Sequence, residues 1–276
     1  MNAAFQALCA RLSAAGVPDA RFDAAELYRF VTRREPRLDS GLSPDEAARL
    51  AALADRRAAR EPLQYILGEW DFMDFTLKVG AGVLCPRADS EVVCEAAIEL
   101  LQNTPSPVVY DLCAGTGCLG LGIARHVPGS AVTCVEKSPD AWRYLTANTA
   151  GTSVRAVQAD VFTYCKGLPQ AGADLIISNP PYLTGQEMGE LMPETAREPA
   201  MALDGGADGL DFYRLLTARY RDALRPGGWL VLEIGCAQAA DVLALGQAHG
   251  WGNGSCRKDY GGNDRAILLQ NPEKIP

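Results

Sequence analysis

The fold is decided by one stretch, Val108-Val109-Tyr110-Asp111-Leu112-Cys113-Ala114-Gly115-Thr116-Gly117. Its first five residues predict a β-strand, and the glycines that follow predict a tight turn into a helix that begins near Cys118. Glycine lets the backbone approach a ligand closely, and the first turn of a helix offers free N–H groups and a partial positive charge. The stretch therefore predicts a strand, a loop and a helix that together bind a ligand.

Apolar strands alternate with helices from this stretch onward, which is typical of a doubly wound parallel sheet. We expect five such strands, at residues 108–112, 131–136, 154–157, 174–178 and 229–234. Residues 255–260 and 265–269 flank the turn Gly261-Gly262-Asn263-Asp264 and predict a hairpin. The predicted fold class is α/β, with a Rossmann-like sheet that is parallel except for this antiparallel C-terminal hairpin.

The first 60 residues predict a small bundle of helices, because apolar residues recur there at intervals of three to four. Ser43-Pro44-Asp45-Glu46 has the serine, the proline and the later acid of a capping box, so a helix should begin there. Partly alternating apolar residues at 69–79 predict a short hairpin. We therefore expect a helical domain at 1–67, a hairpin linker at 68–85 and an α/β domain at 86–276.

Charge is divided unevenly along the chain. The 276 residues carry 26 Lys and Arg against 34 Asp and Glu, a formal net charge of −8. Residues 1–67 hold 10 Arg and 9 acidic residues, net +1, so the remainder holds 16 basic and 25 acidic residues, net −9. Nonspecific affinity for nucleic acid comes from Lys and Arg that neutralise phosphates. The acidic balance therefore argues against a nucleic-acid partner.

Neither a membrane span nor a metal site is indicated. No apolar run approaches the roughly 18 residues that a spanning helix needs, and the N-terminus lacks the basic and apolar regions of a targeting peptide. The nine cysteines include no CxxC pair, and only His126 and His249 could add imidazole ligands. We expect a cytoplasmic protein with free thiols, no metal and no membrane contact.

An acidic residue closes the second predicted strand. The loop satisfies the pattern G-x-G-x-x-G at Gly115, Gly117 and Gly120. Glu136 follows Gly115 by 21 residues, as in the dinucleotide fingerprint whose acid binds ribose hydroxyls. This pattern predicts a nucleoside ligand and leaves open whether it is a dinucleotide. Asp160, after the third strand, can accept a hydrogen bond from an adenine amino group beside an apolar cover, or it can be an ordinary surface or capping acid.

The fourth predicted strand ends in Asn179-Pro180-Pro181-Tyr182. Two prolines in series cannot extend a strand ladder and they fix φ, so they hold the carbonyls of this loop outward. The Asn179 side-chain oxygen and the Pro180 carbonyl can each accept one N–H bond from a planar NH2 group, which aligns a poorly nucleophilic nitrogen with an electrophile. Tyr182 can pack against the flat group. Because doubly wound sheets bind ligands at strand ends, this loop predicts a site.

In this order, the glycine loop, Glu136, Asp160 and residues 179–182 resemble class I methyltransferases, which use S-adenosylmethionine to methylate planar nitrogens. The resemblance covers nearly the whole chain, and its other motifs are similar to those of the release factor glutamine methyltransferase family, also called PrmC or HemK. These motifs are residues 61–68, 86–91, 198–199, 202–206, 208–211 and 259–265. The resemblance implies methyl transfer to the side-chain nitrogen N5 of the glutamine in the Gly-Gly-Gln loop of class 1 peptide chain release factors, with S-adenosylhomocysteine as the second product.

The resemblance also implies roles for single residues. The cofactor would lie against Asp111, Cys113, Ala114, Gly115, Thr116, Gly117, Glu136, Asp160, Val161 and Asn179. The substrate would lie against Asn179, Pro180, Pro181, Tyr182 and Arg87, with Asn179, Pro180 and Tyr182 as the catalytic residues. The N-terminal helices would help to dock the release factor, although their Arg side chains could equally form solvated faces. We expect a monomer.

The chain departs from the family pattern at a few positions. Cys113 and Ala114 replace the usual Gly-Thr, Val161 stands where a tryptophan often covers the adenine, and Ala88 replaces the usual second proline after Arg87. None of these changes removes a group that methyl transfer needs.

Several alternatives remain open from the residues. The same chemistry could act on a ribosomal-protein glutamine or on adenine in nucleic acid, because adenine-N6 methyltransferases share Asn-Pro-Pro-Tyr. An adenine substrate calls for a basic groove and a target-recognition domain, and neither is visible in the sequence. An NAD-dependent oxidoreductase would use the same glycine loop and Glu136 but would leave residues 179–182 unexplained. A binding module that has lost activity is indicated only by Cys113, Ala114 and Val161.

Overall fold

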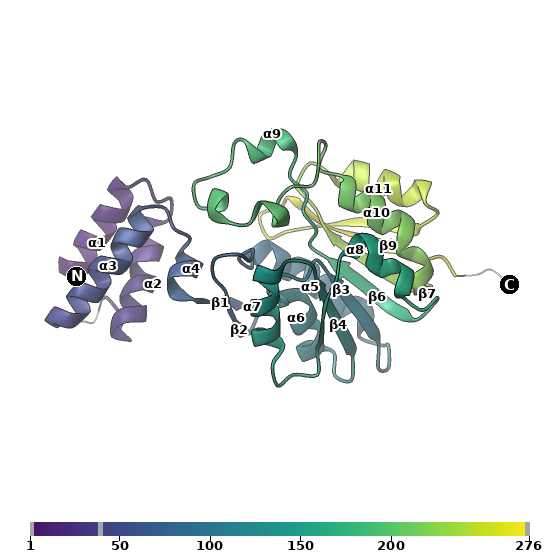
Figure 1. Cartoon of the computed structure of the whole chain (residues 1–276), viewed down its shortest axis with the longest axis horizontal. Helices are drawn as coiled ribbons and strands as arrows, with labels where there is room; N and C mark the ends of the chain where they lie inside the picture. The colour runs from purple at the N-terminus through teal and green to yellow at the C-terminus, as the bar shows by residue number, and fades with distance from the viewer. Residues whose placement is uncertain (1–2, 38–40, 274–276) are drawn as a thin grey trace.

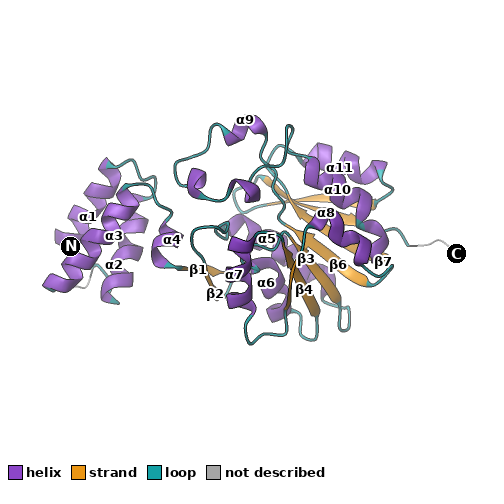
Figure 2. Cartoon of the chain, viewed as in Figure 1, coloured by secondary structure: helices purple, strands orange, loops and turns teal. Residues whose placement is uncertain are grey.

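Residues 3–37 and 41–273 are described by a computed structural model. A helical bundle at the N-terminal end lies beside an α/β domain, and a short helix and a hairpin lie between them (Figure 1). The main sheet of the α/β domain has helices on both of its faces (Figure 2). The expected domains at 1–67 and 86–276 also include residues 1–2, 38–40 and 274–276, which lie outside the described residues.

Three helices form the N-terminal bundle. They are α1 (Ala3–Ala14), α2 (Ala20–Thr32) and α3 (Pro44–Ala58). The bundle has a core of its own, in which Leu12, Leu27 and Tyr28 are fully buried. α3 begins at the predicted place, because the Ser43 hydroxyl accepts the Glu46 N–H at 3.2 Å and the Glu46 carboxylate accepts the Ser43 N–H at 2.8 Å. The predicted bundle and its capping box are confirmed.

A short helix and a hairpin follow the bundle. They are α4 (Leu63–Leu67), β1 (Glu69–Phe72) and β2 (Phe75–Lys78). The strands pair antiparallel as predicted, with Glu69 opposite Lys78 and Phe72 opposite Phe75. Phe72 and Leu77 are buried in the core of the α/β domain, so the hairpin packs with that domain.

The main sheet has seven strands in the order β5-β4-β3-β6-β7-β9-β8. The parallel strands are β3 (Val108–Leu112), β4 (Ala131–Glu136), β5 (Arg155–Gln158), β6 (Ala173–Ser178) and β7 (Leu224–Glu233). β8 (Gly252–Lys258) and β9 (Asp264–Gln270) pair antiparallel, and β9 is also antiparallel to β7. The predicted Rossmann-like sheet with an antiparallel C-terminal hairpin is confirmed.

Two strands begin earlier than the sequence indicates. β7 starts at residue 224 rather than 229, and β8 starts at residue 252 rather than 255. The Pro-Gly-Gly stretch at 226–228 has the composition of a loop. It is nevertheless held beside the C-terminal end of β9, because the Gly227 N–H donates to the Asn271 carbonyl and the Asn271 N–H donates to the Gly228 carbonyl, each at 2.8 Å. Local sequence patterns do not reveal such long-range bonds.

Helices cover both faces of the sheet. One layer contains α5 (Ala88–Leu101), α6 (Cys118–His126) and α7 (Pro139–Thr149), and the other contains α8 (Val161–Tyr164), α10 (Asp211–Arg219) and α11 (Ala239–Ala248). Along β6, Leu175 and Ile177 pack into the first layer and Ile176 into the second. A parallel strand covered on both faces needs a continuous apolar run. This explains why β6 is buried at every position.

The long connection from β6 to α10 passes over the carboxyl-end edge of the sheet and contains α9 (Gly185–Met188) (Figure 1). Leu183 pairs with Asp204 within this connection, so it folds back on itself. None of the described helices is both long and apolar enough to cross a membrane.

Candidate active site

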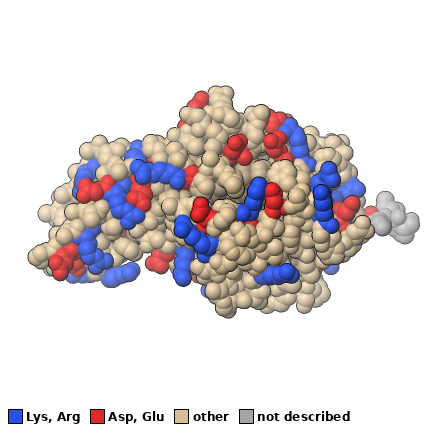
Figure 3. Space-filling view, viewed as in Figure 1, with Lys and Arg blue, Asp and Glu red and all other residues tan. Residues whose placement is uncertain are grey.

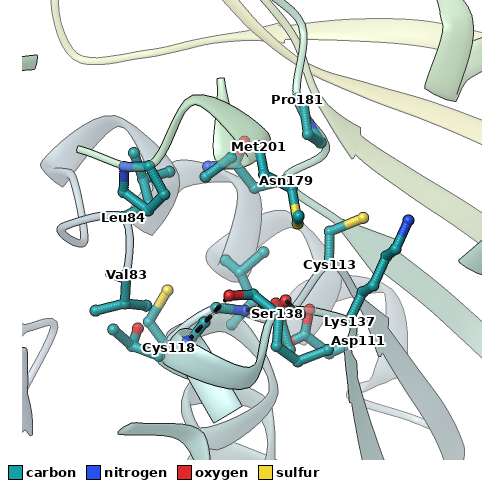
Figure 4. A pocket seen from close by; sticks show the side chains of 18 of the residues that line it. Val83, Leu84, Asp111, Cys113, Cys118, Lys137, Ser138, Asn179, Pro181 and Met201 are labelled. Carbon is teal, nitrogen blue, oxygen red and sulfur yellow. Dashed lines mark hydrogen bonds between the residues drawn. The ribbon is translucent and has the colours of Figure 1, made fainter. Parts of the chain in front are cut away.

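One cavity opens at the carboxyl ends of β3, β4 and β6, where the strands of a doubly wound sheet bind ligands (Figure 4). About 1000 Å³ of space lies within it when its open mouth is included. Its lining brings together the predicted residues Asp111, Cys113, Ala114, Gly115, Thr116, Glu136, Asp160, Val161, Asn179 and Pro181. The predicted residues that do not line it are Arg87, Gly117, Pro180 and Tyr182.

Two glycines let the loop and α6 approach the sheet. Gly117 has a left-handed φ of 84°, and a Cβ there would lie 2.7 Å from Cδ1 of Leu145. Gly120 packs so closely on Cys134 that a Cβ would collide with its sulfur. The N-terminus of α6 therefore faces the cavity. Cys113 has a φ of 59°, which is uncommon for a non-glycine residue.

Asp111 brings a buried carboxylate to the cavity from the end of β3. Its Oδ2 accepts the Gly120 N–H at 2.9 Å and the Cys134 thiol at 3.6 Å, whereas Oδ1 has no partner among the described residues. Burial raises the pKa of Asp111 to about 7. A buried acceptor without a partner costs roughly 1–3 kcal/mol. The ammonium group of an amino-acid moiety fits this position, because it would donate to Oδ1 and neutralise the carboxylate.

Glu136 ends β4 and is held by two backbone groups. Its Oε2 accepts the Gly115 N–H at 2.8 Å, and its Oε1 accepts the Ser138 N–H at 2.6 Å. An ionised carboxylate offers about four lone-pair positions, so each oxygen can accept one more hydrogen bond. The two hydroxyls of a ribose fit these positions. Asp111 and Glu136 together therefore fit S-adenosylmethionine, which carries both an ammonium group and a ribose.

The residues after β5 cap the N-terminus of α8 and place aromatic rings at the cavity. Asp160 accepts the Phe162 N–H at 2.9 Å and pairs with Lys137 at 2.9 Å, so it caps α8 while it lines the cavity. Val161 is buried, whereas Phe162 is 45% exposed and lies edge-on to Phe212, with 5.3 Å between ring centroids. Both phenylalanines line the cavity, and the sequence prediction missed them. The sequence feature that could have indicated Phe162 is its position as an apolar residue close to Asp160.

The Asn-Pro-Pro-Tyr loop forms the opposite wall from Asp111 and Ser138 (Figure 4). The Asn179 Nδ2 donates to the Ser90 Oγ at 3.3 Å, which leaves Oδ1 as an acceptor for a ligand. Pro180 is buried, and burial raises the pKa of the Tyr182 phenol to about 12, so that this phenol stays protonated at neutral pH. Contact of Pro180 and Tyr182 with a substrate stays a prediction.

Arg87 supports the wall of the cavity. Its Nη2 lies 2.8 and 2.9 Å from the two carboxylate oxygens of Glu198, which is buried. The residues just after Glu198 line the cavity, at Pro199, Met201 and Ala202. The ion pair therefore fixes this segment over the site. Direct contact of Arg87 with a substrate stays a prediction.

The same segment is also tied to the N-terminal bundle. Glu194 accepts hydrogen bonds from Arg60 at 2.6 Å to each of its oxygens, and Arg57 adds one at 2.8 Å. Arg57 is buried and pairs with Asp23 of α2 at 2.6 Å. Partial burial alone would raise the pKa of Glu194, but the hydrogen bonds from Arg60 and Arg57 lower it to about 2. No local pattern of residues predicts this contact between distant segments.

The described part of the chain holds no group of three or more His, Cys, Asp or Glu side chains that could bind a metal ion. Cysteines do line the cavity, at Cys85, Cys113 and Cys118. Burial raises the pKa of the Cys118 thiol to about 12, and it raises that of Cys85 and Cys113 as well. These thiols are therefore apolar lining at neutral pH.

Comparison with known proteins places the chain in a family. Residues 3–68 match the family described as PrmC N-terminal domain, and residues 76–206 match the Methyltransferase small domain. The release factor glutamine methyltransferase of Geobacter sulfurreducens is 40% identical over 233 residues, which is 83% of this chain and 80% of that protein. The release factor glutamine methyltransferase of Moorella thermoacetica is 37% identical over 274 residues, which is 96% of each chain.

The fold is also found among solved structures. That of the hMettl16 catalytic domain in complex with MAT2A 3'UTR hairpin 6 gives a TM-score of 0.56 over 85% of this chain and 84% of that chain, at 13% identity. This likeness concerns the fold alone. The sequence relatives match over most of their length, which confirms the resemblance and leaves the oxidoreductase alternative without support. The chain belongs to the release factor glutamine methyltransferase family.

Proposed function

We propose that the protein transfers a methyl group from S-adenosylmethionine to the side-chain nitrogen N5 of the glutamine in the Gly-Gly-Gln loop of class 1 peptide chain release factors. One observation carries the proposal: Asn179, whose Oδ1 is left as an acceptor, lines the same cavity as Asp111 and Glu136. The carboxylates of Asp111 and Glu136, which fit the ammonium and the ribose of the cofactor, therefore share a cavity with Asn179, which fits a planar amide. The full-length relatives carry the corresponding name.

The cofactor would be held by residues from three strand ends. Asp111 would accept from the ammonium group, Glu136 from the ribose hydroxyls, and the Phe162 ring would cover the adenine beside Asp160. The sulfonium of S-adenosylmethionine, when bound, supplies the methyl group. The loop from Cys113 to Gly117 would border the methionine part.

The chain's own contribution to the reaction is to hold the amide nitrogen. Its lone pair is delocalised, so the nitrogen attacks only if it is held in line with the methyl carbon. Asn179 Oδ1 and the Pro180 carbonyl would each accept one N–H of the amide, which raises the electron density on nitrogen as the N–C bond forms. The S–C bond electrons stay with sulfur, and the nitrogen releases one proton to solvent. The positive charge of the sulfonium disappears, so alignment contributes more than acid catalysis.

A protein substrate suits the surface better than nucleic acid does. On the face shown in Figure 3, Lys and Arg side chains are interspersed with Asp and Glu. Many of the basic groups are paired, as in Arg214 with Asp208 and Arg257 with Glu99. Because both signs of charge are mixed on it, this face provides no continuous track for phosphates. A glutamine of a ribosomal protein remains the second candidate.

We further propose three functional parts, at 1–67, 68–85 and 86–276, of which the first helps to dock the release factor. The match of residues 3–68 to a family domain of their own supports this division. The ion pair of Arg60 with Glu194 supports a docking role, because it joins the bundle to the segment that lines the site. We also propose that the protein acts as a monomer in the cytoplasm.

The proposal is tested by incubating the protein and S-adenosylmethionine with a purified release factor, a ribosomal protein or DNA in parallel. Mass spectrometry should find one added methyl group on the Gly-Gly-Gln peptide of the release factor. A release factor whose glutamine is replaced by asparagine is the control and should stay unmodified. Methylation of the ribosomal protein or DNA instead would contradict the proposal.

A further inference from the structure

The amide of Asn179 can face the cavity in two ways. Oriented with Oδ1 toward the substrate, it accepts an N–H bond from the substrate amide. Rotated by half a turn, it presents Nδ2, and two donors then face each other. In the structure Nδ2 donates to the Ser90 Oγ at 3.3 Å, which leaves Oδ1 as the acceptor. Transfer therefore depends on what keeps the amide in this orientation.

The Ser90 hydroxyl decides the orientation, because it can either donate or accept. Ser90 lies in the first turn of α5 and is 1% exposed, as is Glu233 at the end of β7. Burial raises the pKa of Glu233, and hydrogen bonding with the Ser90 side chain lowers it by a smaller amount. An ionised carboxylate only accepts, so the Ser90 hydroxyl donates its hydrogen bond to Glu233, and the lone pairs of Oγ face the Asn179 Nδ2. Each hydrogen bond from the substrate amide through Asn179 and Ser90 to Glu233 then has a fixed donor and a fixed acceptor.

Glu233 is surrounded by charged groups from several elements. Arg265 of β9 and Arg87 before α5 favour its ionised form, whereas Asp89 of α5 disfavours it. Burial is the largest influence and raises the pKa of Glu233 to about 7. Its Oε2 has no partner among the described residues, so no hydrogen bond fixes that oxygen as an acceptor. Near neutral pH the group changes from an acceptor to a group that can donate to Ser90.

We propose that Ser90 and Glu233 are positioning residues that hold the Asn179 amide with its oxygen toward the substrate nitrogen. The proposal rests on the proposed methyl transfer to a planar amide. It gives a role to the buried carboxylate of Glu233. When Glu233 is protonated, the Ser90 proton is free to donate to Oδ1, and the amide loses its preferred orientation.

The first test uses Ser90→Ala and Ser90→Thr. At saturating cofactor and release factor, Ser90→Ala should lower kcat by about 10- to 100-fold, the cost of a misplaced reacting group. Calorimetry should find cofactor affinity unchanged, and Ser90→Thr should restore most of kcat because it keeps the hydroxyl. Ser130→Ala is the matched control, since Ser130 is also buried but precedes β4 at the opposite edge of the sheet. An unchanged kcat in Ser90→Ala would overturn the proposal.

The second test uses the pH profile. The kcat of the wild type should rise as the pH increases through about 7, whereas Glu233→Gln should have lower kcat and no such rise. Asp111 titrates in the same range but acts on cofactor affinity, so saturating cofactor removes its influence. The same rise in Glu233→Gln would contradict the role of Glu233, even if Ser90→Ala failed to fold.

The third test does not need a methylated product. The side-chain NH2 resonances of Asn179, identified by their loss in Asn179→Ala, should shift and exchange faster with solvent in Ser90→Ala than in Ser130→Ala. Unchanged resonances would overturn the positioning role whatever the substrate is. If the resonances change but no release factor is methylated, the proposed function fails and the positioning of Asn179 stands.

Discussion

Arg60 and Glu194 form a two-point ion pair across the boundary between the N-terminal bundle and the α/β domain. The Arg60 Nε and Nη2 each donate to one oxygen of Glu194, both at 2.6 Å. The side chains are 20% and 18% exposed, so the pair is shielded from solvent more than a typical surface pair. This geometry favours arginine over lysine, because only the guanidinium offers two parallel donors.

Loss of this pair should weaken docking without touching the chemistry. In Arg60→Ala we expect a higher KM for a full-length release factor, and an unchanged KM and kcat for a short Gly-Gly-Gln peptide. Arg56→Ala is the matched control, because Arg56 pairs with Glu61 rather than Glu194. Steady-state kinetics on both substrates checks this prediction. An equal effect of Arg60→Ala on the peptide would show that the pair acts on the site itself.

The stability of the domain contact should depend on pH through Glu194. Its pKa in the folded protein is lowered to about 2 from an ordinary value of 4.5. A lowered acid pKa stabilises the folded state above the ordinary value, and this stabilisation is lost as the pH falls from 4.5 toward 2. Urea unfolding of the wild type should therefore lose more stability across this window than that of Glu194→Gln. Parallel losses in both proteins would contradict the assignment.

Asn179→Ala should separate binding from chemistry. Removing the acceptor for the substrate amide should lower kcat by about 10²- to 10³-fold, as the loss of one aligned transition-state hydrogen bond does elsewhere. Cofactor affinity, measured by calorimetry, should change little because Asp111 and Glu136 remain. A normal kcat would exclude Asn179 from the reaction.

Phe162 should contribute to cofactor affinity. In Phe162→Ala we expect affinity to fall by about 3- to 10-fold, the value of one aromatic contact. Phe22→Ala is the control, because Phe22 is 53% exposed and makes a similar edge contact with Trp70 in the bundle and linker. Titration calorimetry compares the two. Equal affinities for both variants would mean that another group covers the adenine.

Binding of the cofactor should release a proton near neutral pH. The pKa of Asp111 is raised to about 7 by burial, and an ammonium beside Oδ1 would lower it again. Affinity should therefore increase as the pH rises through about 7, and Asp111→Asn should bind more weakly with no such dependence. Calorimetry in buffers of different ionisation enthalpy measures the released proton directly. Binding without proton release would place the ammonium elsewhere.

Much of the fold follows from local patterns. The continuous apolar run of β6 and the capping box at Ser43 each have a short-range cause, and both were predicted in the right place. The site residues on the strand ends also come together as expected, because parallel strands end at one edge of the sheet.

The remaining parts of the site depend on contacts between distant segments. Asn179 and Ser90 are 89 positions apart, Arg87 and Glu198 are 111 apart, and Arg60 and Glu194 are 134 apart. Charge or hydroxyl groups at such separations give no periodic signal in the sequence. The ion pair between Arg87 and the buried Glu198 was therefore not predicted, and contact of Arg87 with a substrate stays a prediction.

The segment from Glu194 to Ala202 has one consequence for the timing of the reaction. Glu194 is anchored to the bundle, Glu198 follows four positions later and is anchored to Arg87, and the next residues form the cavity wall. This short segment thus connects the bundle to the wall of the cavity from which the used cofactor would be released. The residence time of bound S-adenosylhomocysteine, measured by stopped-flow displacement, should shorten when Arg60→Ala frees Glu194 from the bundle. The bundle would then influence release of the used cofactor as well as docking of the protein substrate.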